Sequence, residues 1–163
     1  MNYFDLLGIN ESFHLDTAEL KRKYYHLSKS LHPDLLQNSS TWENQASVLE
    51  TEKINMAYET LKDPFKRLKH LLEIHDVLNE NQNVDQSFLM EVMEINENIM
   101  ELEMESNIEL LKNTQKLWND LSQSIDTEIQ PYLQKFNEGD RSQENFAAIK
   151  RIFFKIKIFI ADK

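Results

Sequence analysis

The sequence predicts an all-α protein in two parts, an N-terminal domain built on a helical hairpin and a C-terminal antiparallel bundle of three helices. Glycine and proline, which interrupt helices, occur only 2 and 3 times among the 163 residues. Apolar residues recur at spacings of three and four, the period of an amphipathic helix, and no stretch alternates as a half-buried strand does. Hydrophobic residues make up 40% of the chain, which is enough for a packed core.

The N-terminal part, residues 1–75, is expected to contain four helices. Gly8 can end the first, because glycine readily takes the left-handed conformation that follows many helices. Asp16 is a good N-cap for the second helix, which Pro33 ends, and Pro64 suits the first position of the fourth. The expected helices span roughly residues 3–7, 16–31, 42 or 44 to 61, and 65–74. Their apolar positions are Leu20, Tyr24, Leu27, Leu31, Val48, Leu49, Ile54, Ala57, Tyr58, Leu61, Phe65, Leu68, Leu71 and Leu72.

A polar linker, residues 76–84, separates this part from the C-terminal bundle, residues 85–163. Asp85 or Ser87 can cap the first helix of the bundle, and Pro131 inside the long second helix should kink or split it. Three helices with short connections favour an antiparallel arrangement. The apolar seams are Phe88, Val92, Ile95, Ile99 and Leu102, then Ile108, Leu111, Trp118, Leu121, Ile125, Ile129, Tyr132 and Phe136, and last Phe146, Ile149, Ile152, Phe153, Ile156, Phe159 and Ile160.

Composition excludes several classes of function. The net charge is −10, of which residues 1–75 carry −2 and residues 76–163 carry −8, and this argues against nucleic-acid binding. Cysteine is absent, so there is no disulfide, no thiolate metal site and no cysteine nucleophile, and no iron–sulfur cluster held by thiolates of this chain. No signal peptide and no apolar run of membrane-spanning length is visible, so a cytoplasmic protein without membrane contact is expected.

The most informative motif is His32-Pro33-Asp34, which follows a helix rich in lysine and arginine. A histidine–carboxylate pair is part of a hydrolase triad, but no suitable nucleophile or oxyanion-binding turn accompanies it. Two ligands are too few for a metal site, and His14 and His26 offer no matching spacing. The plain structural interpretation is a helix end followed by an ordinary turn.

The segments around this motif resemble the J-domain, the module that stimulates the ATPase of DnaK- and HscA-type chaperones. The matching segments, in order, are residues 3–9, the basic helix, the His-Pro-Asp motif, and residues 54–67. The resemblance implies a co-chaperone that is not itself an enzyme and needs no cofactor. It implies that Asp34 pairs with an arginine of the chaperone, that Pro33 fixes the loop, and that His32 holds it by hydrogen bonding and packing.

The resemblance also assigns the helix before the motif to chaperone docking. Lys21, Arg22 and Lys29 would meet an acidic chaperone surface and speed the encounter, and Tyr24 or Tyr25 would pack at its edge, with Tyr25 preferred. His26 stands where many J-domains carry a strong cation, which implies weaker or pH-sensitive docking. Taken singly, each basic residue is also consistent with an ordinary solvated side chain.

The second part resembles the HscB family, called Jac in mitochondria, whose members are J-domain co-chaperones of iron–sulfur cluster assembly. The match rests on Phe88-Leu89-Met90-Glu91 and the glutamates that follow. It implies that an IscU-type iron–sulfur scaffold protein binds the bundle and is delivered to the chaperone to promote cluster transfer. The implied scaffold-binding residues are Leu89, Met90, Met93, Glu94, Glu97, Glu101 and Phe154. Which of Phe153 and Phe154 faces the partner stays open, and a bacterial form is favoured because the cysteine-rich element of some eukaryotic homologues is missing.

Helical geometry agrees with this assignment. Leu89, Met90 and Met93 fall beside the apolar seam at 100° per residue and should be partly exposed, next to a row of three glutamates. Two other interpretations remain: Leu89, Met90 and Met93 could belong to a broad core face, and the glutamates could serve solubility. A J-domain co-chaperone with a different client is the alternative function.

Overall fold

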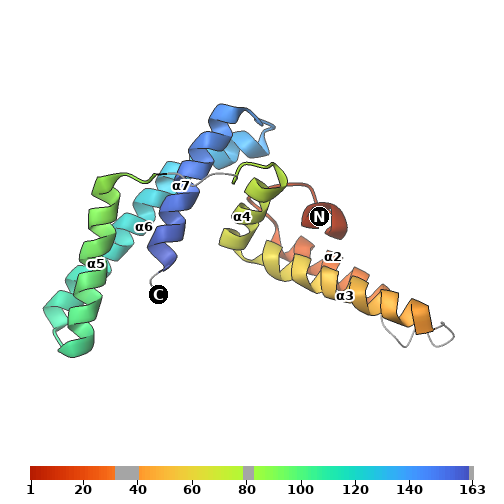
Figure 1. The fold of residues 1–163 in the computed structure, drawn as a ribbon, viewed down its shortest axis with the longest axis horizontal. Helices are drawn as coiled ribbons and strands as arrows, with labels where there is room; N and C mark the ends of the chain where they lie inside the picture. Colours follow the sequence, from red (N-terminus) through yellow and green to blue (C-terminus); the bar gives the residue numbers. More distant parts are fainter. Residues whose placement is uncertain (32–40, 79–82, 162–163) are drawn as a thin grey trace. The chain divides into compact units, whose positions relative to one another are not determined.

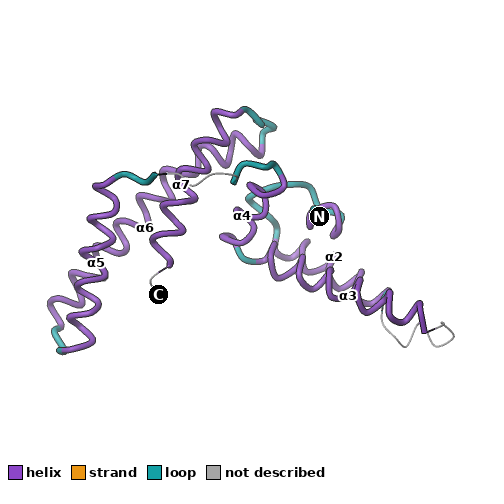
Figure 2. The backbone as a smooth tube through the Cα atoms, in the orientation of Figure 1, coloured by secondary structure: helices purple, strands orange, loops and turns teal. Residues whose placement is uncertain are grey.

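In the computed structural model the described residues, 1–31, 41–78 and 83–161, form two compact units, Met1–Asp76 and Val77–Lys163. All regular secondary structure in these described ranges is α-helical, as the tube in Figure 2 shows. The all-α prediction is therefore confirmed. Each unit is described separately below.

The first unit contains four helices, α1 (Tyr3–Leu7), α2 (Thr17–Ser30), α3 (Thr41–Lys62) and α4 (Pro64–Ile74) (Figure 1). The Tyr24 hydroxyl of α2 donates a hydrogen bond to Asn55 of α3, and the Ser47 hydroxyl of α3 donates to the carbonyl of Leu31. A later residue of one helix thus meets an earlier residue of the other, so α2 and α3 form an antiparallel hairpin. Helix α1 packs against both, and α4 packs against α3.

The predicted helix ends of this unit are correct where the structure describes them. Gly8 follows α1 with φ of 63°, and Asp16 caps α2 by accepting a hydrogen bond from the amide of Ala18. Asp63 caps α4 by accepting from two amides of its first turn, with Pro64 at the first helical position. These signals are local, so the sequence contains all of the information needed to place them.

Val48 and Leu49 correct the prediction of the core, because their side chains are 56% and 57% exposed. Helix α3 instead turns toward its neighbours the face that contains Ser47, Ile54, Ala57 and Leu61, at helical spacings of seven, three and four. Ser47 lies on this face because its hydroxyl satisfies the last carbonyl of the α2 end. A polar residue therefore occupies a position where the apolar pattern predicted valine or leucine.

The second unit is a bundle of three helices, α5 (Gln86–Met104), α6 (Ile108–Asn137) and α7 (Gln143–Ala161) (Figure 1). Helix α6 packs along both neighbours, and α5 also contacts α7. The predicted antiparallel bundle is confirmed. Its buried apolar residues are Phe88, Val92, Ile95, Leu121, Ile125, Ile129, Leu133, Phe136, Ile149, Ile152, Phe153 and Phe159.

Pro131 does not split the long helix, because α6 continues without interruption from Ile108 to Asn137. Proline removes the hydrogen bond to the carbonyl four residues earlier, here that of Thr127. Both Pro131 and Thr127 are exposed, so water can hydrogen bond to that carbonyl. The predicted split is wrong for this reason.

Ile108 and Leu111 were also predicted to be core residues, but they are 73% and 54% exposed. The ring of Trp118 stacks on Phe159, with centroids 4.0 Å apart, and α7 continues only to Ala161. The first turns of α6 therefore lie beside α5 without a third helix alongside them. A two-helix segment cannot bury the apolar positions that a three-helix segment buries.

The buried His70 fastens α1 to α4. Its Nε2 accepts a hydrogen bond from the amide of Tyr3 at 3.1 Å, and its ring stacks on the Tyr3 ring at 4.3 Å. Glu11 adds a second connection, because its carboxylate contacts His75 at 2.9 Å and accepts from the Asn2 amide at 2.8 Å. Burial lowers the pKa of His70, while Glu73 and then Glu11 oppose the shift and the N-terminal ammonium adds to it.

The lowered pKa predicts how the stability of the first unit depends on pH. Neutral His70 is favoured in the folded state, so its contribution is complete above the ordinary histidine pKa of about 6.5 and is lost as the pH falls through it. The free energy of unfolding, measured by urea denaturation from pH 7 to 5, should therefore decrease. His70→Gln keeps an acceptor that does not titrate, so its stability should decrease less, and equal slopes for the two proteins would contradict the assignment.

Candidate functional site

One face of α2 carries the basic residues predicted to contact a chaperone. Lys21, Arg22 and Lys29 are all exposed, while Leu20 is buried on the opposite side of the helix. The Lys21 ammonium lies 5.7 Å from the centroid of the Tyr25 ring, and Tyr25 is 59% exposed. We call Lys21, Arg22, Tyr25 and Lys29 the basic face.

The two tyrosines of α2 have different surroundings. Tyr24 is half-buried and stacks on Tyr58 of α3 with centroids 4.3 Å apart, and its hydroxyl donates to Asn55 at 3.0 Å. Tyr25 lies on the solvent side, so it is the tyrosine available to a partner. The sequence preferred Tyr25 without excluding Tyr24, and the packing of Tyr24 against Tyr58 agrees with that preference.

His32, Pro33 and Asp34 lie outside the described residues. The described chain on their N-terminal side is held in place, because the Leu31 amide donates to Leu27 and its carbonyl accepts from Ser47. Helix α3 then begins at Thr41. Within the described ranges, no group of three histidine, aspartate or glutamate residues is arranged to hold a metal ion.

Helix α5 presents the second predicted surface. Met90 and Met93 are 63% and 59% exposed, and Leu89 is half-buried, whereas Phe88 and Val92 are buried against the bundle. The two methionines are therefore not part of the core of this unit. Three exposed glutamates flank them, and we call the set the α5 surface: Leu89, Met90, Met93, Glu94, Glu97 and Glu101.

Phe154 is the accessible member of the phenylalanine pair on α7. Phe153 is 3% exposed and Phe154 is half-buried, with the two rings in an edge contact at 5.6 Å. The adjacent Lys155 reaches Asp85 at 3.1 Å and lies over the Phe88 ring. Phe154 is therefore one residue away from the contact between α7 and the start of α5.

Lys155 joins all three helices of the bundle. Its ammonium lies 3.1 Å from Asp85 of α5 and 3.0 Å from Glu128 of α6, and Arg151 contacts the same Glu128 at 3.2 Å. Burial alone would lower the pKa of Lys155, but hydrogen bonds to Glu128 and Asp85 outweigh burial and raise it. The sequence did not reveal this group, although a lysine and an arginine four residues apart in an apolar helix are a usable signal.

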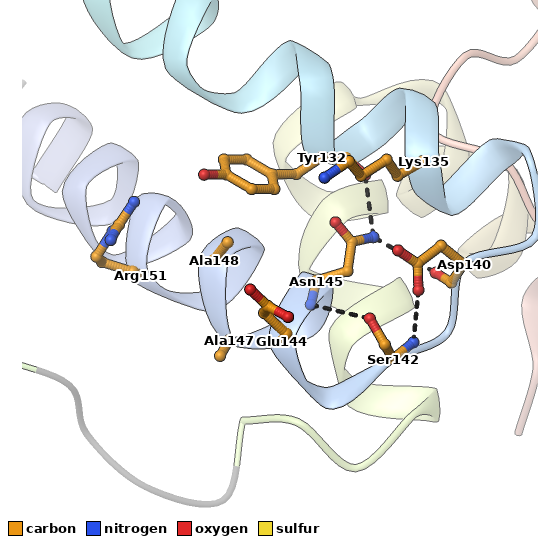
Figure 3. Close-up of a pocket in the computed structure, with 9 residues that line it drawn as sticks. All are labelled: Tyr132, Lys135, Asp140, Ser142, Glu144, Asn145, Ala147, Ala148 and Arg151. Atoms are coloured by element: carbon orange, nitrogen blue, oxygen red, sulfur yellow. Dashed lines mark hydrogen bonds between the residues drawn. The ribbon is translucent and has the colours of Figure 1, made fainter.

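A hollow of about 380 Å³ lies at the other end of α6 and α7, and Figure 3 shows the side chains that line it. Its rim carries Lys135 and Arg151 but also Asp140 and Glu144, so it has no net preference for a charged ligand. The side-chain amide of the buried Asn145 donates to two backbone carbonyls, that of Tyr132 in α6 and that of Asp140 in the turn. We interpret these hydrogen bonds as contacts that hold the α6–α7 turn in place, and we assign no ligand to the hollow.

Asp140 and Ser142, in the turn just before α7, form the hydrogen bonds at the start of that helix. The Asp140 carboxylate accepts a hydrogen bond from the backbone amide of Ser142 at 2.8 Å. The Ser142 hydroxyl accepts one from the backbone amide of Asn145 at 3.3 Å. The hydrogen bonds to Ser142 lower the pKa of Asp140, burial opposes this shift, and Lys135 and Arg141 add to it. These are capping interactions of the kind that locate a helix start.

Comparison with known proteins assigns both units. Residues 2–70 match a family described as the DnaJ domain, and residues 84–160 match one described as the HSCB C-terminal oligomerisation domain. A co-chaperone protein HscB homolog of Shewanella halifaxensis is 32% identical over 165 residues, which cover 97% of this chain and 92% of that protein. The human iron-sulfur cluster co-chaperone protein HscB is 30% identical, with 97% of this chain and 64% of the human protein covered.

Solved structures agree with these matches. The crystal structure of human HscB has a TM-score of 0.76 at 29% identity and covers 98% of this chain and 77% of its own. HscB from Vibrio cholerae has a TM-score of 0.67 at 28% identity and covers 99% and 92%. The first unit is thus a DnaJ domain, which makes the protein a J-domain protein. Because the second unit and the full-length relatives also match, the chain belongs to the HscB co-chaperone family. No helix among the described residues is long and apolar enough to cross a membrane.

The Lys155 group yields a prediction for the bundle. Lys155→Met removes the ammonium and leaves two carboxylates with fewer partners, so the bundle should lose about 1–3 kcal/mol of unfolding free energy. The measurement is urea unfolding followed by Trp118 fluorescence in a Trp42→Phe background, because Trp118 stacks on Phe159 inside the bundle. Lys157→Met on the exposed side of α7 is the matched control, and equal losses in both variants would refute the role of Lys155.

Proposed function

We propose that this protein is an adaptor between an IscU-type iron–sulfur scaffold and an HscA/DnaK-type chaperone. The scaffold binds the bundle, the J-domain brings it to the chaperone, and the resulting ATP hydrolysis promotes cluster transfer. The observation that carries the proposal is the joining, in one chain, of a DnaJ domain to an HscB C-terminal domain. The human relative's name, iron-sulfur cluster co-chaperone, supports the same client.

In docking to the chaperone, the basic face and the His-Pro-Asp motif have different roles. Lys21, Arg22 and Lys29 attract an acidic chaperone surface over several ångströms and raise the rate of encounter. Asp34 then makes the specific contact, a charge-assisted pair with a chaperone arginine. The hydrogen bond from the Ser47 hydroxyl of α3 to the Leu31 carbonyl supports this division of roles, because it keeps the end of α2 in register with the hairpin just before the motif.

On the client side, the α5 surface supplies both affinity and orientation. Met90 and Met93 offer flexible apolar side chains that adapt to a partner and release water on binding. The neighbouring glutamates favour a partner with basic residues along one edge and disfavour a misaligned one. Phe154 extends this surface onto α7.

The chain has no cysteine, so it cannot hold the cluster with thiolates of its own, and the cluster is cargo that stays on the scaffold. Bringing scaffold and chaperone together on one chain raises their effective concentration for each other. In this proposal the adaptor performs no chemical step, and ATP is hydrolysed by the chaperone.

The first test concerns the chaperone contact. Asp34→Asn removes one charge with almost no change in size, so chaperone ATPase stimulation should fall at least about tenfold. Steady-state ATP hydrolysis by a purified HscA/DnaK-type chaperone measures this, and circular dichroism establishes that the variant is folded. A folded variant that stimulates fully would rule out the proposed role of Asp34.

The second test concerns the client contact. Leu89→Ala combined with Met93→Ala should weaken binding of a purified IscU-type scaffold by roughly tenfold or more, as measured by titration calorimetry. ATPase stimulation without scaffold should not change, because both residues lie in the second unit. Met56→Ala on α3, where the side chain is 60% exposed, is the matched control. If wild-type protein shows no scaffold binding, the client is a different one.

A further inference from the structure

The end of the bundle where α5 meets α6 carries four large apolar side chains that are exposed to solvent. Met100 is 65% exposed and Met104 is 89% exposed at the end of α5, and Ile108 and Leu111 are 73% and 54% exposed at the start of α6. We call these four residues the tip cluster. Such a group on one small area marks a contact site more often than a random surface does.

The arrangement of the helices explains why the bundle leaves the tip cluster exposed. Trp118 stacks on Phe159 near the end of α7, so the turns of α6 before Trp118 have α5 as their helical neighbour. An apolar side chain here could be replaced by a polar one without loss of core packing. Neither the fold of this unit nor its stability therefore accounts for the tip cluster.

The two members of the tip cluster on α5, Met100 and Met104, continue the α5 surface along the same side of that helix. At 100° per residue, Leu89, Met93, Met100 and Met104 fall within about 60° of arc, which makes one stripe. The stripe is about 22 Å long at 1.5 Å per residue. It is centred roughly 140° from the core positions Phe88 and Ile95, so α5 has two separate apolar sides.

The charges beside the stripe define the occupant. Helix α5 contains five glutamates and neither lysine nor arginine, and Glu94, Glu97 and Glu101 run along one edge of the stripe. Further glutamates, Glu105 and Glu109, lie next to the tip cluster. A segment of similar length with apolar residues on one face and lysine or arginine along one edge complements this pattern, and methionine adapts to such partners.

We propose that the tip cluster and the α5 surface form one continuous docking surface for a basic amphipathic segment of the client protein, about four helical turns long. The inference rests on the proposed function, because it assigns this segment to the same scaffold that contacts Leu89 and Met93. It adds Met100, Met104, Ile108 and Leu111 as residues that determine affinity and specificity.

The test uses two variants of the full chain at exposed positions. Met100→Gln combined with Met104→Gln keeps side-chain length and helix propensity while removing the apolar surface. Ile108→Gln combined with Leu111→Gln does the same on α6. Titration calorimetry with a purified IscU-type scaffold should show binding about tenfold weaker for each pair, and Met56→Gln on α3 should bind like wild type. Circular dichroism melts verify that each variant keeps its helical content.

The outcomes separate this inference from the proposed function. If Leu89→Ala with Met93→Ala loses binding while both glutamine pairs bind within about twofold of wild type, the tip cluster is not part of the docking surface and the proposed function stands. If wild-type protein does not bind the scaffold, both proposals fail. If sedimentation velocity shows that wild-type protein self-associates and the glutamine pairs do not, a second copy occupies the tip cluster and the inference is overturned.

Discussion

The stacking of Tyr24 on Tyr58, with the Tyr24 hydroxyl hydrogen-bonded to Asn55, determines which residues of α2 are exposed on the surface of the first unit. This contact fixes the rotation of α2 about its own axis, because a helix anchored by one side chain has one set of residues facing its neighbour. Lys21 and Arg22 are then exposed to solvent, and the hydrogen bond from Ser47 to the Leu31 carbonyl holds the end of α2 at a defined level of α3. Chaperone docking in our proposal depends on that rotation as much as on the basic residues themselves.

In the second unit, α5 has two apolar sides, of which one is buried and the other is exposed. Phe88, Val92 and Ile95 pack into the bundle, while Lys155 ties the first turn of α5 to Glu128 of α6. A lysine that bridges two carboxylates is specific in direction, whereas apolar packing tolerates rotation. The contacts of Lys155 are therefore placed to help keep the stripe of Leu89, Met93, Met100 and Met104 on the outside of the bundle.

Local signals in the sequence placed the helices well. The cap at Asp16, the left-handed Gly8 and Pro64 at the start of α4 depend only on residues a few positions away, so the local sequence is enough to predict them. The same locality made the exposure of Met90 and Met93 predictable from their angle to Phe88 and Val92. Their role in binding a client follows from the family resemblance and stays a prediction, as do the roles of His32, Pro33 and Asp34, which lie outside the described residues.

The sequence by itself thus determined the all-α class, the helix ends at Gly8, Asp16 and Pro64, and the family, since these depend on local propensity and on motifs. Only the tertiary structure decided which apolar residues are buried. Val48, Leu49, Ile108 and Leu111 satisfy the helical period yet lie exposed, and Phe153 rather than Phe154 is buried. The physical reason is that burial requires a neighbour. Apolar residues that recur with the helical period indicate that a helix has an apolar side. The length and rotation of the adjoining helices decide how much of that side is covered.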